Sequence, residues 1–214
     1  MDATEKIQTP ELLQILRDRL MMAHYRLGDK LRSGEISREF KIAPGTAREV
    51  MLRLAGEGLL EYEEQRGFRV TRRSADRLKD IARFRLLLDQ EGATRSIENG
   101  DIEWEASLTA AHHKLSHIEQ RIARAEDERP YLKPCNDAEL EFHLAVISAA
   151  EMPLLSSTYR RVYAQFRQLM VDPETGGWSR ADNTREHQRI LEAALTRDSA
   201  RCRAALYDHL ERHL

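Results

Sequence analysis

The chain has 214 residues, a formal net charge of −2 and 33% charged residues. Its hydrophobic content of 41% is enough for a packed core, which excludes a globally disordered protein. The sequence contains neither an apolar run long enough to cross a bilayer nor the layout of a secretory signal. Two cysteines, Cys135 and Cys202, are too few for a disulfide scaffold. These observations exclude a membrane or disulfide-stabilised secreted protein and favour the cytoplasm.

The first part of the chain predicts three helices. Thr9 is a candidate N-cap, Pro10 suits the first helical position, and leucines follow at helical spacing. A short helix is expected at about residues 34–41, and a longer one at about residues 44–57. Only two residues separate these helices, and their apolar residues lie on facing sides. This pattern is typical of a helix-turn-helix.

Two short strands are expected after this pair of helices. Gly58 ends the second helix, residues 59–62 and 67–71 have strand character, and residues 63–66 form the turn between them. A hairpin directly after a helix-turn-helix makes a winged helix, whose arginines can bond to guanine or to phosphate. The outward residues of the second helix are Thr46, Arg48, Glu49 and Arg53.

The remainder of the chain predicts an all-α domain. Breaks are expected at Gly100, at a linker over residues 130–136, and at residues 151–153 and 172–177. The predicted fold is therefore mainly α, with a winged helix-turn-helix at residues 8–73 followed by a six-helix bundle at residues 75–214. The six helices are expected at residues 75–98, 102–125, 137–150, 153–171, 180–196 and 199–214.

Three histidines fall on the inward faces of three different predicted helices. They are His143, His187 and His209, and Glu139 lies one turn before the first of them. Neutral imidazoles and a carboxylate that meet in a bundle core suit a divalent ion. Without a partner, each of these groups would be buried at a cost in free energy. The expected ion is zinc, with nickel as a second possibility.

Simpler explanations exist for several of these residues. Glu139 follows Asn136 by three residues and is also compatible with the N3 position of a capping box. A single interior histidine is more often a hydrogen-bonded core residue than a metal ligand. His113 and His117 lie opposite the apolar stripe of their helix and are expected to face solvent. His213 has the inward phase, but its terminal position makes it a weaker candidate than His209.

The first part of the chain resembles the winged-helix domain of GntR-type bacterial transcription regulators. The resemblance lies in residues 45–60, with the sequence GTAREVMLRLAGEGLL, and in residues 66–70, with the sequence RGFRV. It implies DNA contacts by Thr46, Arg48 and Arg53 and by Arg66 and Gly67 of the wing. A winged helix that binds another protein is the alternative.

The resemblance is incomplete in three places. Ala43-Pro44 occupy the position where the family usually has Ser-Arg. Ile36-Ser37 replace the usual Leu-Ala, and Leu27-Gly28 replace the usual Pro-Gly. The absent arginine removes an expected contact to a base or a phosphate. Affinity for DNA is therefore expected to depend more on Arg48 and on the wing.

The second part resembles the FCD ligand-binding domain of the FadR-type branch of this family. That branch carries an Asp-x-x-x-His motif and two later histidines, which match His143, His187 and His209, with Glu139 in place of the usual Asp. The resemblance also implies that Arg85 binds the carboxylate of a small organic acid. An ion pair between Arg85 and Asp89 within one helix is the alternative.

These observations predict a homodimeric transcription regulator that binds double-stranded DNA and is not an enzyme. The resemblance implies a repressor that a small organic acid releases from its operator. A helical metalloenzyme is one alternative, although the sequence offers neither a spare base near the ligands nor a phosphate-binding loop. A regulator that senses the metal ion itself is the other.

Overall fold

The computed structural model describes residues 7–170 and 183–214, and it confirms the predicted mainly helical fold. The chain divides into two units. The first unit holds the chain up to Ser74 together with the end of a later helix from Ala164 on. The second unit holds Ala75–Tyr163 and the C-terminal helices. No helix in the described ranges is long and apolar enough to cross a membrane.

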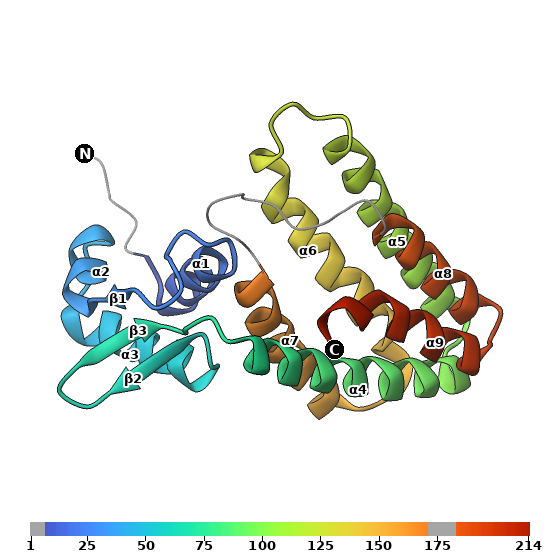
Figure 1. Cartoon of the computed structure of the whole chain (residues 1–214), viewed down its shortest axis with the longest axis horizontal. Coiled ribbons are helices and arrows are strands. Elements are labelled where there is room, and N and C mark those ends of the chain that lie inside the picture. The colour runs from blue at the N-terminus through green and yellow to red at the C-terminus, as the bar shows by residue number, and fades with distance from the viewer. Residues whose placement is uncertain (1–6, 171–182) are drawn as a thin grey trace. The chain divides into compact units, whose positions relative to one another are not determined.

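The first unit begins with three helices: α1 (Thr9–Met21), α2 (Ser33–Glu39) and α3 (Pro44–Gly56) (Figure 1). Both longer helices begin with a proline in the first turn, where its missing N–H costs no hydrogen bond. The prediction that Thr9 caps α1 is wrong by one residue, since Thr9 is already helical and Gln8 takes the cap position. The core contains leucines of α1 and the inner face of α3: Leu12, Leu16, Leu20, Ala47, Val50, Met51 and Leu54.

The turn between α2 and α3 depends on a buried serine. Ser37 Oγ donates a hydrogen bond of 2.7 Å to the backbone oxygen of Ile42. Lys41, within the turn, adopts a φ of +51°. Ser37 therefore provides a partner for a carbonyl of the tight turn, which gives this departure from the family sequence a structural role.

The sheet of the first unit has three strands: β1 (Lys30–Leu31), β2 (Leu60–Glu63) and β3 (Gly67–Val70). Both pairs are antiparallel and the strand order is β1-β3-β2. The predicted hairpin is the β2–β3 pair, whereas β1 was not predicted because two residues are too few to show an alternating pattern. Gly67 has a φ of +83° directly after the wing turn, a conformation that glycine adopts without strain.

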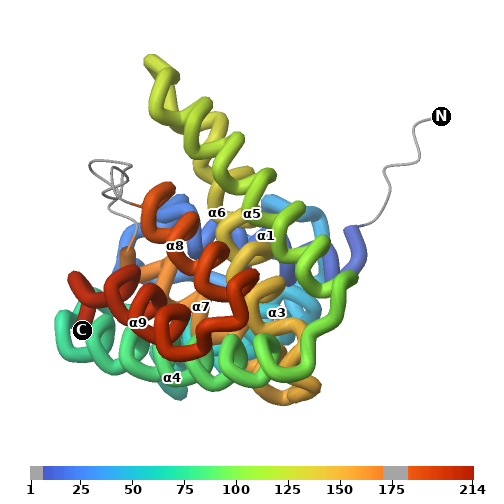
Figure 2. Tube along the Cα trace, turned by 90° about the vertical axis from the view of Figure 1, so that its right-hand side faces the viewer, coloured from blue at the N-terminus to red at the C-terminus, as the bar shows by residue number. Residues whose placement is uncertain are grey.

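The second unit consists of helices with short connections. Asp101 and Asp198 cap two of them by accepting a hydrogen bond from a backbone N–H of the first turn. Two of the longer helices, α5 (Ile102–Ile122) and α6 (Arg129–Val146), lie side by side (Figure 2). The helices are α4 (Ala75–Asn99), α5 (Ile102–Ile122), α6 (Arg129–Val146), α7 (Pro153–Met170), α8 (Asn183–Leu195) and α9 (Ser199–Leu210).

Helix α6 corrects one predicted boundary. The linker expected at residues 130–136 is helical, because Pro130 lies in the first turn and Pro134 is accommodated inside the helix. Asn136 and Glu139 are therefore interior helical residues, and the capping-box interpretation of Glu139 is wrong. The break predicted at residues 172–177 and the helix start predicted at Arg180 lie outside the described residues.

A glycine allows close packing of α4. A Cβ atom added at Gly92 would lie 2.7 Å from the Cβ atom of Ile147. We expect Gly92→Ala to lower the free energy of unfolding by about 1–3 kcal/mol, because the added methyl group overpacks this contact. Urea denaturation measures the change. The matched control is Gly56→Ala, where nothing lies within 4 Å of the added atom and a neutral or stabilising effect is expected; equal effects of the two variants would contradict the packing argument.

Candidate metal centre and DNA-binding surface

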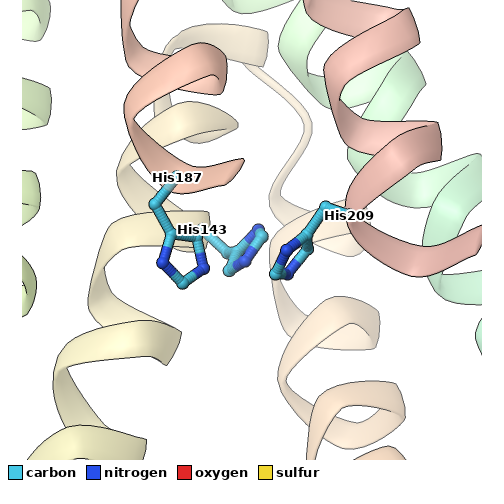
Figure 3. A group of neighbouring side chains, drawn as sticks. All are labelled: His143, His187 and His209. Carbon is cyan, nitrogen blue, oxygen red and sulfur yellow. The ribbon is translucent and has the colours of Figure 1, made fainter. Parts of the chain in front are cut away.

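Three helices of the second unit bring a histidine to one point in its interior. His143 of α6, His187 of α8 and His209 of α9 are 0%, 1% and 6% exposed. A ligand atom of each ring lies within 4.8 Å of those of the other two. The ring centroids are 4.8–5.7 Å apart, and Figure 3 shows the three imidazoles grouped together between the ribbons. The helical phase of the sequence predicted this convergence.

Glu139, the fourth predicted ligand, is not part of this group. Its side chain is buried, and its charge contributes to raising the pKa of Arg85. The structure therefore brings together three of the four residues predicted to hold the ion.

Arg85 belongs to a buried network between α4 and α7. Its Nε donates to the hydroxyl of Tyr159 at 3.1 Å and lies 3.5 Å from Asp89 Oδ2. Tyr159 donates in turn to Asp89 at 3.3 Å. Burial works to lower the pKa of Arg85, but Tyr159 and Asp89 outweigh it and raise the pKa above the ordinary value. The ion pair between Arg85 and Asp89 within one helix, which the sequence offered as the alternative, is therefore present, and both of its side chains are fully buried.

Asp89 connects this network to the histidines. Its second oxygen, Oδ1, lies 3.3 Å from His143 Nδ1. Asp89 was considered in the sequence only as a partner of Arg85. The sequence offered no signal for its contact with His143, because the two residues lie on different helices and are far apart along the chain.

Burial favours the neutral form of two of the imidazoles, those of His143 and His209. Burial lowers the pKa of His143 and lowers that of His209 well below its ordinary value. The neighbouring rings and Arg85 act in the same direction on His209. A metal binds the neutral imidazole, so these groups need to lose no proton to act as ligands near neutral pH.

The predicted DNA contacts lie on the surface of the first unit. Arg48 and Arg53 of α3 and Arg66 of the wing turn are exposed, whereas Thr46 and Gly67 are partly exposed. Arg48 donates to the hydroxyl of Tyr62 in β2 at 2.7 Å, and its guanidinium lies 5.3 Å from the centre of that ring. Tyr62, which the sequence did not indicate, thus packs against one of the predicted DNA contacts.

The other two arginines pair with neighbouring carboxylates. Arg53 donates to Glu49 at 2.6 Å, and Arg66 donates to Glu63 at 2.9 Å. Both pairs are exposed, so each contributes little to stability and can be exchanged for a phosphate at low cost.

Comparison with known proteins identifies both parts of the chain. The model of the FCD domain matches residues 80–212, and that of the bacterial regulatory proteins of the gntR family matches residues 9–70. The first match covers more than half of the chain. The chain belongs to the GntR family and carries an FCD domain. It is a transcriptional regulator of that family.

Individual relatives agree with this assignment. The chain is 29% identical to the HTH-type transcriptional regulator BphR of Paraburkholderia xenovorans, over 92% of the chain and 80% of the relative. It is 24% identical to the HTH-type transcriptional repressor GlaR of Escherichia coli, over 91% of the chain and 89% of the relative. The solved structure of E. coli McbR/YncC has the same fold, with a TM-score of 0.77 at 18% identity over 95% of this chain and 93% of that one.

The histidines of this FCD domain suit a metal ion. Both ring nitrogens of His143 and the Nε2 atom of His187 are buried without a hydrogen-bond partner among the described residues. Buried polar atoms without partners are rare in proteins, and a bound cation would satisfy them. Three imidazole nitrogen donors match zinc and other divalent ions of borderline softness.

The buried histidines of the FCD domain predict a pH dependence of stability. In the metal-free protein the pKa of His143 and of His209 is lowered, and that of His213 is lowered to about 4 by burial. Below the ordinary pKa of about 6.5 the unfolded chain binds protons that the folded chain does not. The free energy of unfolding should therefore fall as the pH is lowered from about 7.5 to about 5.5.

Urea denaturation in the presence of a chelator measures this slope, which is at most ~1.4 kcal/mol per pH unit for each such group. His143→Gln should make the slope smaller. A free energy of unfolding that is the same at both pH values would contradict the prediction.

Proposed function

We propose that this regulator binds an operator through its winged helix and is released from it when a small organic acid binds at a metal site in the FCD domain. The observation that carries the proposal is the buried group of His143, His187 and His209, which Asp89 connects to the charged side chain of Arg85. The proposed parts are a DNA-binding domain at residues 8–73 and a sensing and dimerisation domain at residues 75–214. Such a regulator would work in the cytoplasm.

The three histidines are the proposed ligands, and Glu139 is a further candidate from the sequence pattern. Zinc is the proposed ion, and nickel would suit the same donors. When bound, the ion would supply a Lewis acid to which one carboxylate of an organic acid can bind. His143, His187 and His209 would hold it in an interior from which water is excluded.

Arg85 is the proposed partner of a second anionic group of the acid. Its pKa lies above the ordinary value, so it is a cation at every physiological pH. A guanidinium binds a carboxylate through two parallel hydrogen bonds, which fixes both the position and the orientation of the acid. Asp89 already pairs with Arg85, so an acid that binds there would rearrange this buried pair.

The winged helix supplies the proposed contacts to DNA. Thr46, Arg48 and Arg53 of α3 would face the major groove, and Arg66 and Gly67 would reach the backbone or the neighbouring groove. A homodimer would present two such surfaces to a pseudo-palindromic operator. The name of GlaR as a repressor supports the same action for this chain.

The three-histidine group also supports a second candidate, a regulator that senses the metal ion itself. The two candidates differ in what changes the affinity for DNA. Under the metal-sensor alternative, dialysis against a chelator alone changes it. Under the proposed function, a change also requires the organic acid. The relatives are named as regulators, which argues against the alternative of a metalloenzyme.

The DNA contact is tested at Arg48. Arg48→Ala removes a guanidinium on α3 that can bond to a base or a phosphate, and should weaken binding to the DNA upstream of the protein's own gene by about tenfold or more. Gel retardation measures the change. Arg124→Ala, an exposed position beyond α5, is the matched control and should leave the retardation unchanged. Equal binding by both variants would exclude Arg48 from the DNA-binding surface.

The metal site is tested at His187. His187→Ala removes one of three nitrogen donors and should abolish bound zinc in elemental analysis of the purified protein, because two remaining donors hold the ion far more weakly. The control is His113→Ala, since that histidine is exposed on α5 and outside the group. Unchanged zinc content in the His187 variant would show that the proposed ligand set is wrong.

A further inference from the structure

Two of the three histidines contact a carboxylate through the ring nitrogen Nδ1. His187 Nδ1 lies 3.0 Å from Glu119 Oε1, and His209 Nδ1 lies 2.8 Å from Glu186 Oε2. Both carboxylates are mostly buried, with exposed side-chain fractions of 12% and 9%. Neither glutamate was singled out in the sequence, because each contact joins two different helices.

We propose that Glu119 and Glu186 are positioning residues, which fix the tautomer and the orientation of His187 and His209 so that the Nε2 atoms of both rings are presented to the metal ion. The inference rests on the proposed metal site and specifies how the chain prepares it before the ion arrives. It concerns the residues behind the ligands rather than the ligands themselves.

A neutral imidazole carries a hydrogen atom on only one of its two ring nitrogens. One ring nitrogen holds the N–H and the other holds a lone pair, while an ionised carboxylate only accepts hydrogen bonds. A carboxylate at Nδ1 therefore places the hydrogen on Nδ1 and leaves the lone pair on Nε2. In metal sites this second contact orients the ring and raises its basicity as a ligand.

The position of His187 agrees with this assignment. Its Nε2 atom is buried and has no hydrogen-bond partner within the described ranges, so its lone pair is not engaged elsewhere. A lone pair left unpaired in the interior costs free energy in the metal-free protein. Glu119 stabilises the ring in this conformation, and a cation would then supply the missing partner.

Glu186 has a second contact that supports the same role. Arg212 Nη2 lies 2.5 Å from Glu186 Oε1, while Oε2 of the same carboxylate faces His209. The guanidinium contact holds this carboxylate in place, so that Oε2 remains beside Nδ1 of His209. Glu186 and His187 are neighbours on α8. This helix therefore provides the ligand His187 and, through Glu186, positions the ligand His209 of α9.

His143 is held differently. Its Nδ1 atom lies 3.3 Å from Asp89 Oδ1, but the two are not aligned for a hydrogen bond. The other oxygen of Asp89 accepts from Tyr159 and faces Arg85. Asp89 therefore belongs to the network of Arg85, and the inference is restricted to Glu119 and Glu186.

The first test measures the tautomers directly. Nitrogen chemical shifts of the histidine rings in the zinc-free, full-length protein should show the hydrogen on Nδ1 for His187 and His209. This measurement requires no substitution at either glutamate and does not depend on metal binding. A hydrogen on Nε2 of either ring would overturn the proposal for that ring.

The second test measures zinc affinity in variants by competition with a chromophoric chelator. Glu119→Ala and Glu186→Ala should each bind zinc roughly 10–100-fold more weakly, and the absorption bands of the cobalt-substituted protein should shift. Glu119→Gln and Glu186→Gln retain an oxygen acceptor of the same size and should recover part of the affinity. The matched control is Glu192→Ala on α8, whose carboxylate is about half exposed and pairs with Arg201.

The outcomes distinguish this inference from the proposed function. If His187→Ala abolishes zinc binding while both glutamate-to-alanine variants bind zinc as tightly as the Glu192→Ala control, the positioning role is wrong and the metal site stands. If the unmodified protein binds no zinc, the metal site is wrong, and the tautomer measurement still decides whether the glutamates fix the rings.

Discussion

The helices of the second unit bury several polar groups, and the fold of this unit depends on how those groups are satisfied. Arg85, Asp89, His143, His187 and His209 all lie in its interior, where an unpaired polar group costs free energy. Within the Arg85–Asp89 pair, Tyr159 provides a hydrogen-bond partner for Arg85 Nε and for Asp89 Oδ2. Such a pair is no more stabilising than apolar residues of similar volume. The stability of the bundle therefore does not explain why charged groups and imidazoles occupy its centre, whereas the proposed binding of a cation and an anion would explain it.

Apolar residues pack around the histidines and exclude water from them. The ring of Phe142 lies 5.3–5.5 Å from those of His112, His143 and His187, in edge-to-face contacts. It belongs to the apolar core of the second unit, which keeps water from the imidazoles. Exclusion of water lowers the local dielectric constant and favours the neutral rings. The same exclusion would strengthen each electrostatic contact with the proposed ion, so the residues that pack the core would also influence the chemistry of the site.

The sequence predicted most of the fold, because long amphipathic helices show a clear period and prolines mark their first turns. The same period places His143, His187 and His209 on inward faces. It did not predict β1, whose two residues show no period, or the start of α6, where two prolines suggested a linker. The Nδ1 contacts of Glu119 and Glu186 were also missed, since each joins different helices and depends on how those helices pack. Helical phase indicates that a residue faces inward, but only the packed structure shows which residue it meets.

The arginines of the first unit differ in how they are held before any DNA is present. Arg53 and Arg66 lie in exposed ion pairs, which contribute little to stability and are screened by salt. Arg48 instead donates to Tyr62 and lies over the rings of Tyr62 and Phe68. A guanidinium that is already ordered against aromatic rings loses less conformational entropy when it forms further hydrogen bonds. Its position is also fixed relative to the wing, because Tyr62 and Phe68 are paired residues of β2 and β3. Arg48 is therefore suited to recognise a base, which requires a fixed geometry, whereas Arg53 and Arg66 are suited to the less demanding contact with phosphate.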